Sequence, residues 1–136
     1  MLIDDFDFFI ENNDNNTQLV DDKLGYIRGN MFANEYMPYK NYKVRELIAN
    51  SKEEELLIKL SEAEFALNDL SLYLDLHPND TEMYNKFKMY VKEYKTYLDE
   101  YERTFRPLDL CSTYTNIYDY YKNPWPWDND GGVKYV

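Results

Sequence analysis

The stretch SKEEELLIKLSEAEFALNDLSLYLDLHPNDTEMYNKFKMYVKEYKTYLDEYERTFRP, residues 51–107, decides the fold. In its first half, apolar residues recur at spacings of 4, 3, 4, 3 and 4: Leu56, Leu60, Ala63, Leu67, Leu70 and Leu74. In its second half, they recur at spacings of 3, 4, 3, 4, 3 and 4: Tyr84, Phe87, Val91, Tyr94, Leu98, Tyr101 and Phe105. Each pattern is typical of a helix that packs along a partner helix. Because a short turn joins them, we predict an all-α fold built on an antiparallel hairpin of helices at about 52–76 and 81–106.

The ends of both predicted helices are marked by capping residues. Ser51, with Glu54 three residues later, forms a capping box at the start of the first helix. Pro78 ends that helix just before it, because the residue preceding a proline disfavours helical geometry. Asp80 or Thr81 can cap the start of the second helix. The turn between the two helices is therefore short and polar.

A second apolar stripe runs along the first helix. If the leucine seam occupies heptad positions a and d, then Ile58, Phe65 and Leu72 all fall at position f, which faces away from the partner helix. In a two-helix hairpin that position is expected to be polar. We therefore expect the first helix to be covered on two faces. The cover is either the chain's own arms, a second copy or another protein.

Composition restricts the partners of this chain. Its 136 residues correspond to one domain, and its formal net charge is −11. Residues 1–22 contribute −7, because they contain seven acids and no base. A chain this acidic, without a basic stripe, is not expected to bind nucleic acid or an anionic membrane surface. A basic partner is compatible with it.

The sequence also carries predictions about compartment. No stretch approaches the roughly 18 apolar residues of a membrane span. The start of the chain lacks the apolar run of a signal peptide. Cys111 is the single cysteine, which excludes an intrachain disulfide and favours a reducing compartment. We therefore expect synthesis in the cytoplasm.

The chain divides into three regions. Residues 1–22 are predicted to be an acidic arm, and residues 23–50 an aromatic segment that wraps the hairpin and includes Tyr36 and Tyr39. A short helix with buried Leu47 and Ile48 is expected near the end of that segment. Residues 51–136 comprise the hairpin and an aromatic tail.

The tail ends in a run of alternating proline and tryptophan. Asn123-Pro124-Trp125-Pro126-Trp127 favours an extended, polyproline-like backbone, on which rigid indole rings make good anchors. Two interpretations remain open for Trp125 and Trp127. Either they fold back over the second apolar stripe, which we favour because exposed tryptophans are a liability, or they insert into a partner.

No pattern in the sequence predicts a catalytic, cofactor or metal site. His77, the single histidine, is expected to cap the end of the first helix. Cys111 has no histidine beside it in sequence, so it lacks the context of a nucleophile. A metal or redox site would use Asp75, His77 and Cys111 together. An acidic row at seven-residue intervals is interpreted as a solvated face: Glu55, Glu62 and Asp69.

The hairpin and tail resemble the CotJB spore-coat protein family. The matching residues are ALNDLSLYLDLHPND at 66–80, YERTFRPL at 101–108 and NPWPW at 123–127. Arg106 departs from the family pattern, where glycine is expected before the proline. The segment RGNMFANEYMPYK at 28–40 is similar to the companion CotJA family, so the chain looks like a union of two neighbouring polypeptides.

The resemblance implies a non-enzymatic component of the inner endospore coat, made in the mother cell and deposited in the coat. It also implies a CotJC-like manganese catalase and other coat proteins as partners, with a homo-oligomer left open. One alternative is an accessory subunit that stabilises or gates that catalase. Another is a small metal-binding or redox protein. The residues expected to contact a partner are apolar or aromatic: Ile58, Phe65, Leu72, Trp125, Trp127, Tyr36 and Tyr39.

Overall fold

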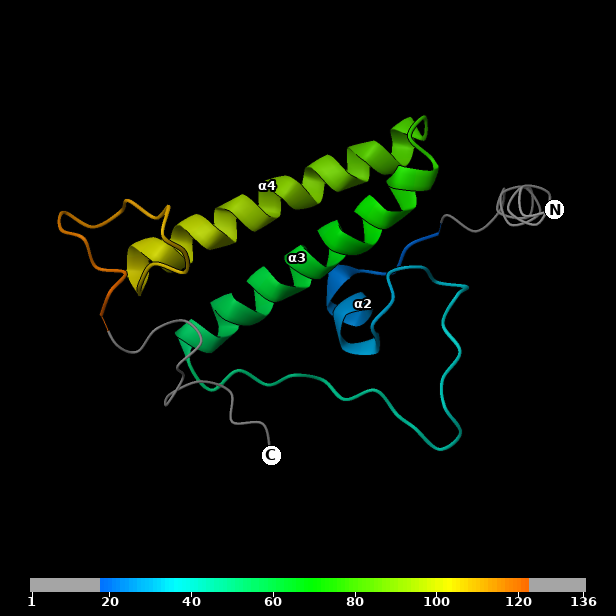
Figure 1. The fold of residues 1–136 in the computed structure, drawn as a ribbon. Coiled ribbons are helices and arrows are strands. Elements are labelled where there is room, and N and C mark those ends of the chain that lie inside the picture. The colour runs from blue at the N-terminus through cyan, green and yellow to red at the C-terminus, as the bar shows by residue number, and fades with distance from the viewer. Residues whose placement is uncertain (1–17, 123–136) are drawn as a thin grey trace.

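Two long antiparallel helices and one short helix form the structure, a computed structural model that describes residues 18–122 (Figure 1). Helix α2 spans Asp22–Arg28, α3 spans Lys52–Leu76 and α4 spans Thr81–Thr104. Helix α3 lies between α2 and α4 in Figure 1 and packs against both. The predicted all-α class is confirmed.

Side-chain caps set the ends of the two long helices. The hydroxyl of Ser51 accepts a hydrogen bond from the N–H of Glu54, and the Glu54 carboxylate accepts one from the N–H of Asn50. At the turn, the Asp80 carboxylate accepts bonds from the Met83 N–H at 3.0 Å and the Tyr73 hydroxyl at 2.8 Å. These bonds hold the pKa of Asp80 below its usual value, the Met83 N–H being the larger cause. Asp80 therefore fixes both the start of α4 and its position beside α3.

The α3 seam agrees with the sequence pattern. Four of its predicted members are buried, namely Leu56, Leu60, Ala63 and Leu70. Leu67 and Leu74 are partly buried against the core cluster.

The seam predicted for α4 is partly wrong. Met83, Tyr90 and Tyr101 are buried, whereas Tyr84 is 50% exposed and Phe105 is 38% exposed. The set that includes Met83 and Tyr90 repeats with the same period as the predicted set, so the spacing alone does not choose between them. Lys88, Lys92 and Lys95 lie beside Val91 and Leu98 of the predicted set. Burying unpaired ammonium groups is costly, so this side of α4 stays exposed to solvent.

Helix α2 was not located by the sequence analysis, although its ends carry ordinary signals. The Asp21 carboxylate caps its start by accepting from the Leu24 N–H at 2.7 Å. Gly29 ends it with φ of 78°, in the left-handed region that favours glycine. The backbone segments on either side of α2 pair with each other: the Val20 N–H donates to the Met31 carbonyl, and residues 18–20 lie beside 31–33. Residues 18–33 therefore form one compact unit.

The unit of residues 18–33 covers α3 through its two most buried side chains. Met31 is completely buried and Phe32 is 8% exposed, and both join the cluster that contains Leu70 and Tyr90. The Met31 N–H donates to the Asp69 carboxylate of α3 at 2.8 Å. A Cβ on Gly25 would lie 2.3 Å from the Met31 sulfur, so the glycine permits this close approach.

Only the first part of the predicted aromatic segment covers the hairpin: residues 23–33 pack on α3, whereas large side chains after residue 36 are exposed. Met37 is 90% exposed and Tyr39 is 85% exposed. The predicted short helix is absent from residues 44–49, and Leu47 and Ile48 are exposed. Met31 and Phe32, from the start of that segment, supply the cover on α3, and the residues that follow do not extend it.

We predict that Met31→Ala lowers the free energy of unfolding by about 2–5 kcal/mol, because it leaves a cavity between α2 and α3. Met37→Ala is the matched control, and its effect is expected to be within about 0.5 kcal/mol because the side chain is exposed. Urea denaturation measures both. Equal effects of the two substitutions would contradict the packing of Met31.

Candidate interaction surface

The second apolar stripe of α3 is covered at its centre and open at one end. Phe65 packs edge-on against the ring of Tyr26 in α2, with 6.0 Å between ring centroids. Ile58 is half-buried. Leu72 is 58% exposed, as is Leu76 one turn later. The stripe is therefore partly satisfied within one copy, and its exposed end lies near the turn of the hairpin.

Residues 37–48, here called the open segment, leave several large apolar side chains exposed to solvent. Met37, Tyr39 and Ile48 are 81–90% exposed, and Tyr42 is 53% exposed. The segment contains no helix, and Asn41 turns it with φ of 65°. It leaves the rest of the fold in a wide loop between α2 and α3 (Figure 1). Its apolar side chains therefore face solvent.

Tyr36 stands at the boundary between the covered and the exposed regions. Its ring lies 5.0 Å from the guanidinium carbon of Arg28. The same guanidinium donates to the carbonyl oxygens of Asn30 and Phe32. Tyr36 is thus fixed beside α2, whereas Tyr39 belongs to the open segment. Trp125 and Trp127, the remaining predicted contact residues, lie outside the described residues.

The acidic row on α3 is not the solvated face that the sequence suggested. The Asp69 carboxylate accepts a hydrogen bond from the Met31 N–H, and Glu62 is only 8% exposed. Burial, followed by repulsion from Asp22, raises the pKa of the Glu62 carboxyl. Two members of the row thus lie beneath the 18–33 unit. Asp69 accepts a hydrogen bond from that unit, whereas Glu62 is buried without such a bond from it.

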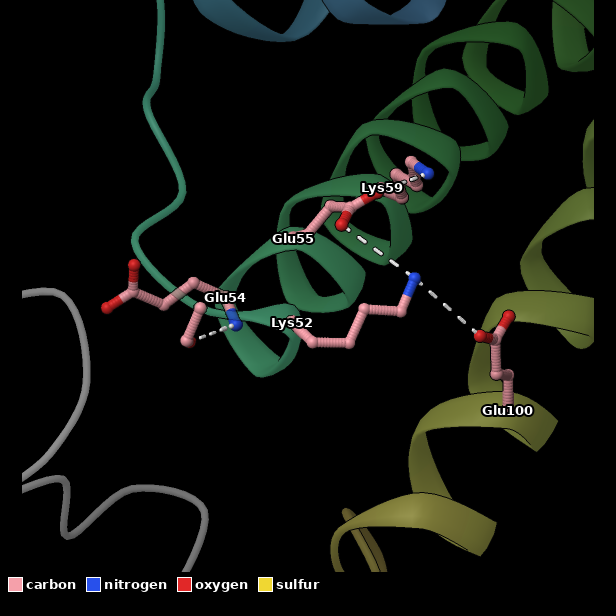
Figure 2. A network of polar contacts seen from close by, with 6 residues as sticks. Lys52, Glu54, Glu55, Lys59 and Glu100 are labelled. Carbon is pink, nitrogen blue, oxygen red and sulfur yellow. Dashed lines mark hydrogen bonds and ion pairs between the residues drawn. The ribbon is translucent and has the colours of Figure 1, made fainter.

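Glu55, the third member of that row, belongs to an ion-pair network at the start of α3 (Figure 2). Figure 2 shows Lys52 reaching from α3 toward Glu100 on α4, with 3.9 Å between nitrogen and oxygen. Lys52 also lies 3.7 Å from Glu55, whose other partner is Lys59 at 2.8 Å. The hydrogen bond from Lys59, with the charge of Lys52, lowers the pKa of Glu55. These side chains are about half exposed, so each pair contributes little to stability.

A tighter contact closes the same end of the hairpin. The Tyr101 hydroxyl donates to the Glu53 carboxylate at 2.8 Å, and Arg106 pairs with the same oxygen at 3.1 Å. Burial, together with the bond to Glu53, raises the pKa of Tyr101 to about 12. Arg106, which departs from the family pattern, therefore has a structural partner just beyond the end of α4.

The residues considered for a metal site are not brought together. His77 caps the end of α3 and packs against Tyr73, with 4.5 Å between ring centroids. Cys111 is exposed and lies beyond the opposite end of the hairpin, after α4. Within residues 18–122, no three His, Cys, Asp or Glu side chains form a group suited to a metal ion. Asp75, His77 and Cys111 therefore form no common site.

None of the helices in this part of the chain is long and apolar enough to span a membrane.

The hairpin and the tail after it match a known family. The family model described as CotJB protein matches residues 54–128. The match begins within α3 and includes α4, so it covers the helices that form the seam. Searches of curated proteins and of solved structures found no match to the chain. The CotJA-like resemblance of residues 28–40 lies outside the matched range and stays a prediction.

We predict that Glu62→Gln stabilises the protein near pH 7 and not near pH 4. A carboxyl whose pKa is raised by folding favours the fold when protonated, and this contribution is lost as the pH rises through the folded-state pKa. The amide removes the buried charge at neutral pH. Thermal unfolding at the two pH values measures the difference.

Glu64→Gln is the control for the loss of one negative charge, because Glu64 lies two residues away and is exposed. Equal stabilisation by the two substitutions near pH 7 would mean that net charge, and not burial of Glu62, is responsible.

Proposed function

The chain belongs to the CotJB family of spore-coat proteins, and from this premise we propose that it is a non-enzymatic assembly component of the inner coat. In this proposal it is made in the mother-cell cytoplasm and binds a CotJC-like manganese catalase, other coat proteins or a second copy of itself. Its role is to hold partners in place, with no reaction of its own.

The observation that carries the proposal is the exposure of the open segment. Met37, Tyr39 and Ile48 are among the most exposed large apolar side chains of the described residues. Burying an apolar side chain is worth about 1.5–3 kcal/mol, so a segment that leaves several in solvent gains most when a partner covers it. Exposed apolar patches of this kind mark interaction sites.

The charge of the open segment also supports a role in binding a partner. Lys40, Lys43 and Arg45 interrupt its apolar residues, within a chain of net charge −11. Of these three bases none forms an ion pair within residues 18–122. The open segment is therefore a basic, aromatic surface on an acidic protein, and it complements an acidic partner surface or an acidic region of another copy.

Leu72 and Leu76 form a second, smaller contact in the proposal. They lie one turn apart on α3 and are equally exposed. Phe65 of the same stripe already packs against Tyr26 within the chain. The end of the stripe at Leu72 and Leu76 is therefore the part left for a partner.

We predict that the triple variant Met37→Ser, Tyr39→Ser, Ile48→Ser loses binding to the catalase-like partner by at least about tenfold in Kd, as expected for loss of apolar anchors. Its melting temperature is expected to stay unchanged, because all three side chains face solvent. Co-purification, light scattering and thermal unfolding of the full chain measure the three properties.

The control is Leu110→Ser with Ile117→Ser, two apolar side chains that are 71% and 64% exposed outside the open segment, and it is expected to keep binding. Undiminished binding and self-association by the triple variant would contradict the proposal. Peroxide turnover of the catalase with and without this chain tests the accessory-subunit alternative. An assembly role predicts unchanged turnover, whereas a gating subunit changes it.

A further inference from the structure

A groove on the outer face of α4 has no role in the fold or in the proposed assembly surface. Its volume is about 670 Å³, and its lining comes from α4 and from Tyr114. Val91 and Leu98 supply apolar surface there, although both were expected to face α3. Because the groove contains no residue of α3, it lies on the side of α4 that the hairpin leaves uncovered.

Tyr114 gives the groove a fixed wall. Its hydroxyl donates to the Asp99 carboxylate, and its ring lies 4.5 Å from the guanidinium carbon of Arg103. Arg103 and Asp99 also pair with each other at 2.9 Å. These contacts tie the segment after α4 back to the helix, so the apolar lining is organised before anything binds.

The rim of the groove is basic. Lys88, Lys92 and Lys95 all line it. None of the three has an acidic partner among residues 18–122. Asp99, the acid of the lining, is engaged by Tyr114 and Arg103. The groove therefore offers apolar contacts between ammonium groups that lack an acidic partner, which suits an extended peptide that alternates apolar and acidic residues.

The chain itself contains such a peptide. Residues 4–11 read DDFDFFIE, with four acids, three phenylalanines, one isoleucine and no base. We propose that residues 4–11 of the same chain occupy the groove on α4, with their phenylalanines against Val91 and Leu98 and their carboxylates beside the three lysines.

The tether is long enough for this intramolecular contact. Residues 18–20 are anchored beside 31–33, next to the core that includes Tyr90 of α4. The anchor lies beside α4, because Leu19 packs against the cluster that contains Tyr90. Seven residues, 11–17, can span at most roughly 23 Å, which exceeds half the circumference of a helix about 10 Å in diameter. A short tether of this kind gives a local concentration in the millimolar range.

The open segment is the competing basic site for residues 4–11, since it contains Lys40, Lys43 and Arg45. Its apolar side chains stand in solvent along an extended loop, with no fixed wall like that of Tyr114. Val91, Leu98 and the ring of Tyr114 give phenylalanine side chains an organised apolar surface on α4, and the groove is therefore the favoured site.

The test is paramagnetic relaxation in the full chain. A nitroxide is attached at Leu2→Cys in a Cys111→Ser background, and the methyl signals of Val91 and Leu98 are recorded with Val44 of the open segment as reference. The proposal predicts loss of the Val91 and Leu98 signals and retention of the Val44 signal. Retention of all three signals would overturn it.

Charge variants identify the site. The groove variant Lys88→Glu, Lys92→Glu, Lys95→Glu is expected to restore the lost signals, whereas the matched control Lys40→Glu, Lys43→Glu, Arg45→Glu is not. Adding Asp4→Lys, Asp5→Lys and Asp7→Lys to the groove variant is expected to bring the loss back. Restoration by the open-segment control instead would overturn the proposal.

Two further measurements keep the test decisive. Asp4→Asn, Asp5→Asn, Asp7→Asn leaves the hairpin untouched, so it is expected to restore the signals even if the groove variant fails to fold. Mixing nitroxide-labelled chains with isotope-labelled chains separates one copy from two. Loss of signal in the mixture would assign the groove to a second copy and overturn the intramolecular contact.

Discussion

The hydrogen bond from the Met31 N–H to the Asp69 carboxylate is the constraint on which the rest of the structure depends. Met31 is completely buried, and a buried backbone N–H must find an acceptor. Asp69 supplies that acceptor from the face of α3 that carries the acidic row. With the donor satisfied, Met31 and Phe32 join the cluster formed by α3 and α4, and Gly25 lets α2 close over Met31.

This cover decides which surfaces are left for partners. The 18–33 unit occupies the middle of the second apolar face of α3, where Tyr26 packs against Phe65. The open segment and the end of the stripe at Leu72 lie outside this contact and are exposed. A coat-assembly role is consistent with such a division, because the hairpin is internally satisfied while a basic, aromatic loop stands free of it.

The sequence predicted the parts of this fold that depend on local periodicity and failed where contacts are long-range. The spacing of leucines located α3, and Asp80 marked the start of α4. The stripe at Ile58, Phe65 and Leu72 predicted a cover, and Tyr26 covers Phe65 while Leu72 stays exposed. An apolar face alone does not say which segment will cover it. The bond between Met31 and Asp69 joins residues 38 positions apart, and no local pattern encodes it. The face of α4 was misjudged because tyrosines surround that helix, so the lysines were the better guide to its exposed side.

Amide hydrogen exchange at Met31 tests the central claim most directly. If the Asp69 carboxylate holds this N–H beneath a stable cover, its exchange is slow and comparable with that of the Leu70 amide in the core of α3. Exchange of the Met31 amide as fast as that of Tyr39 in the open segment would show that the 18–33 unit does not cover the hairpin, and would contradict the account.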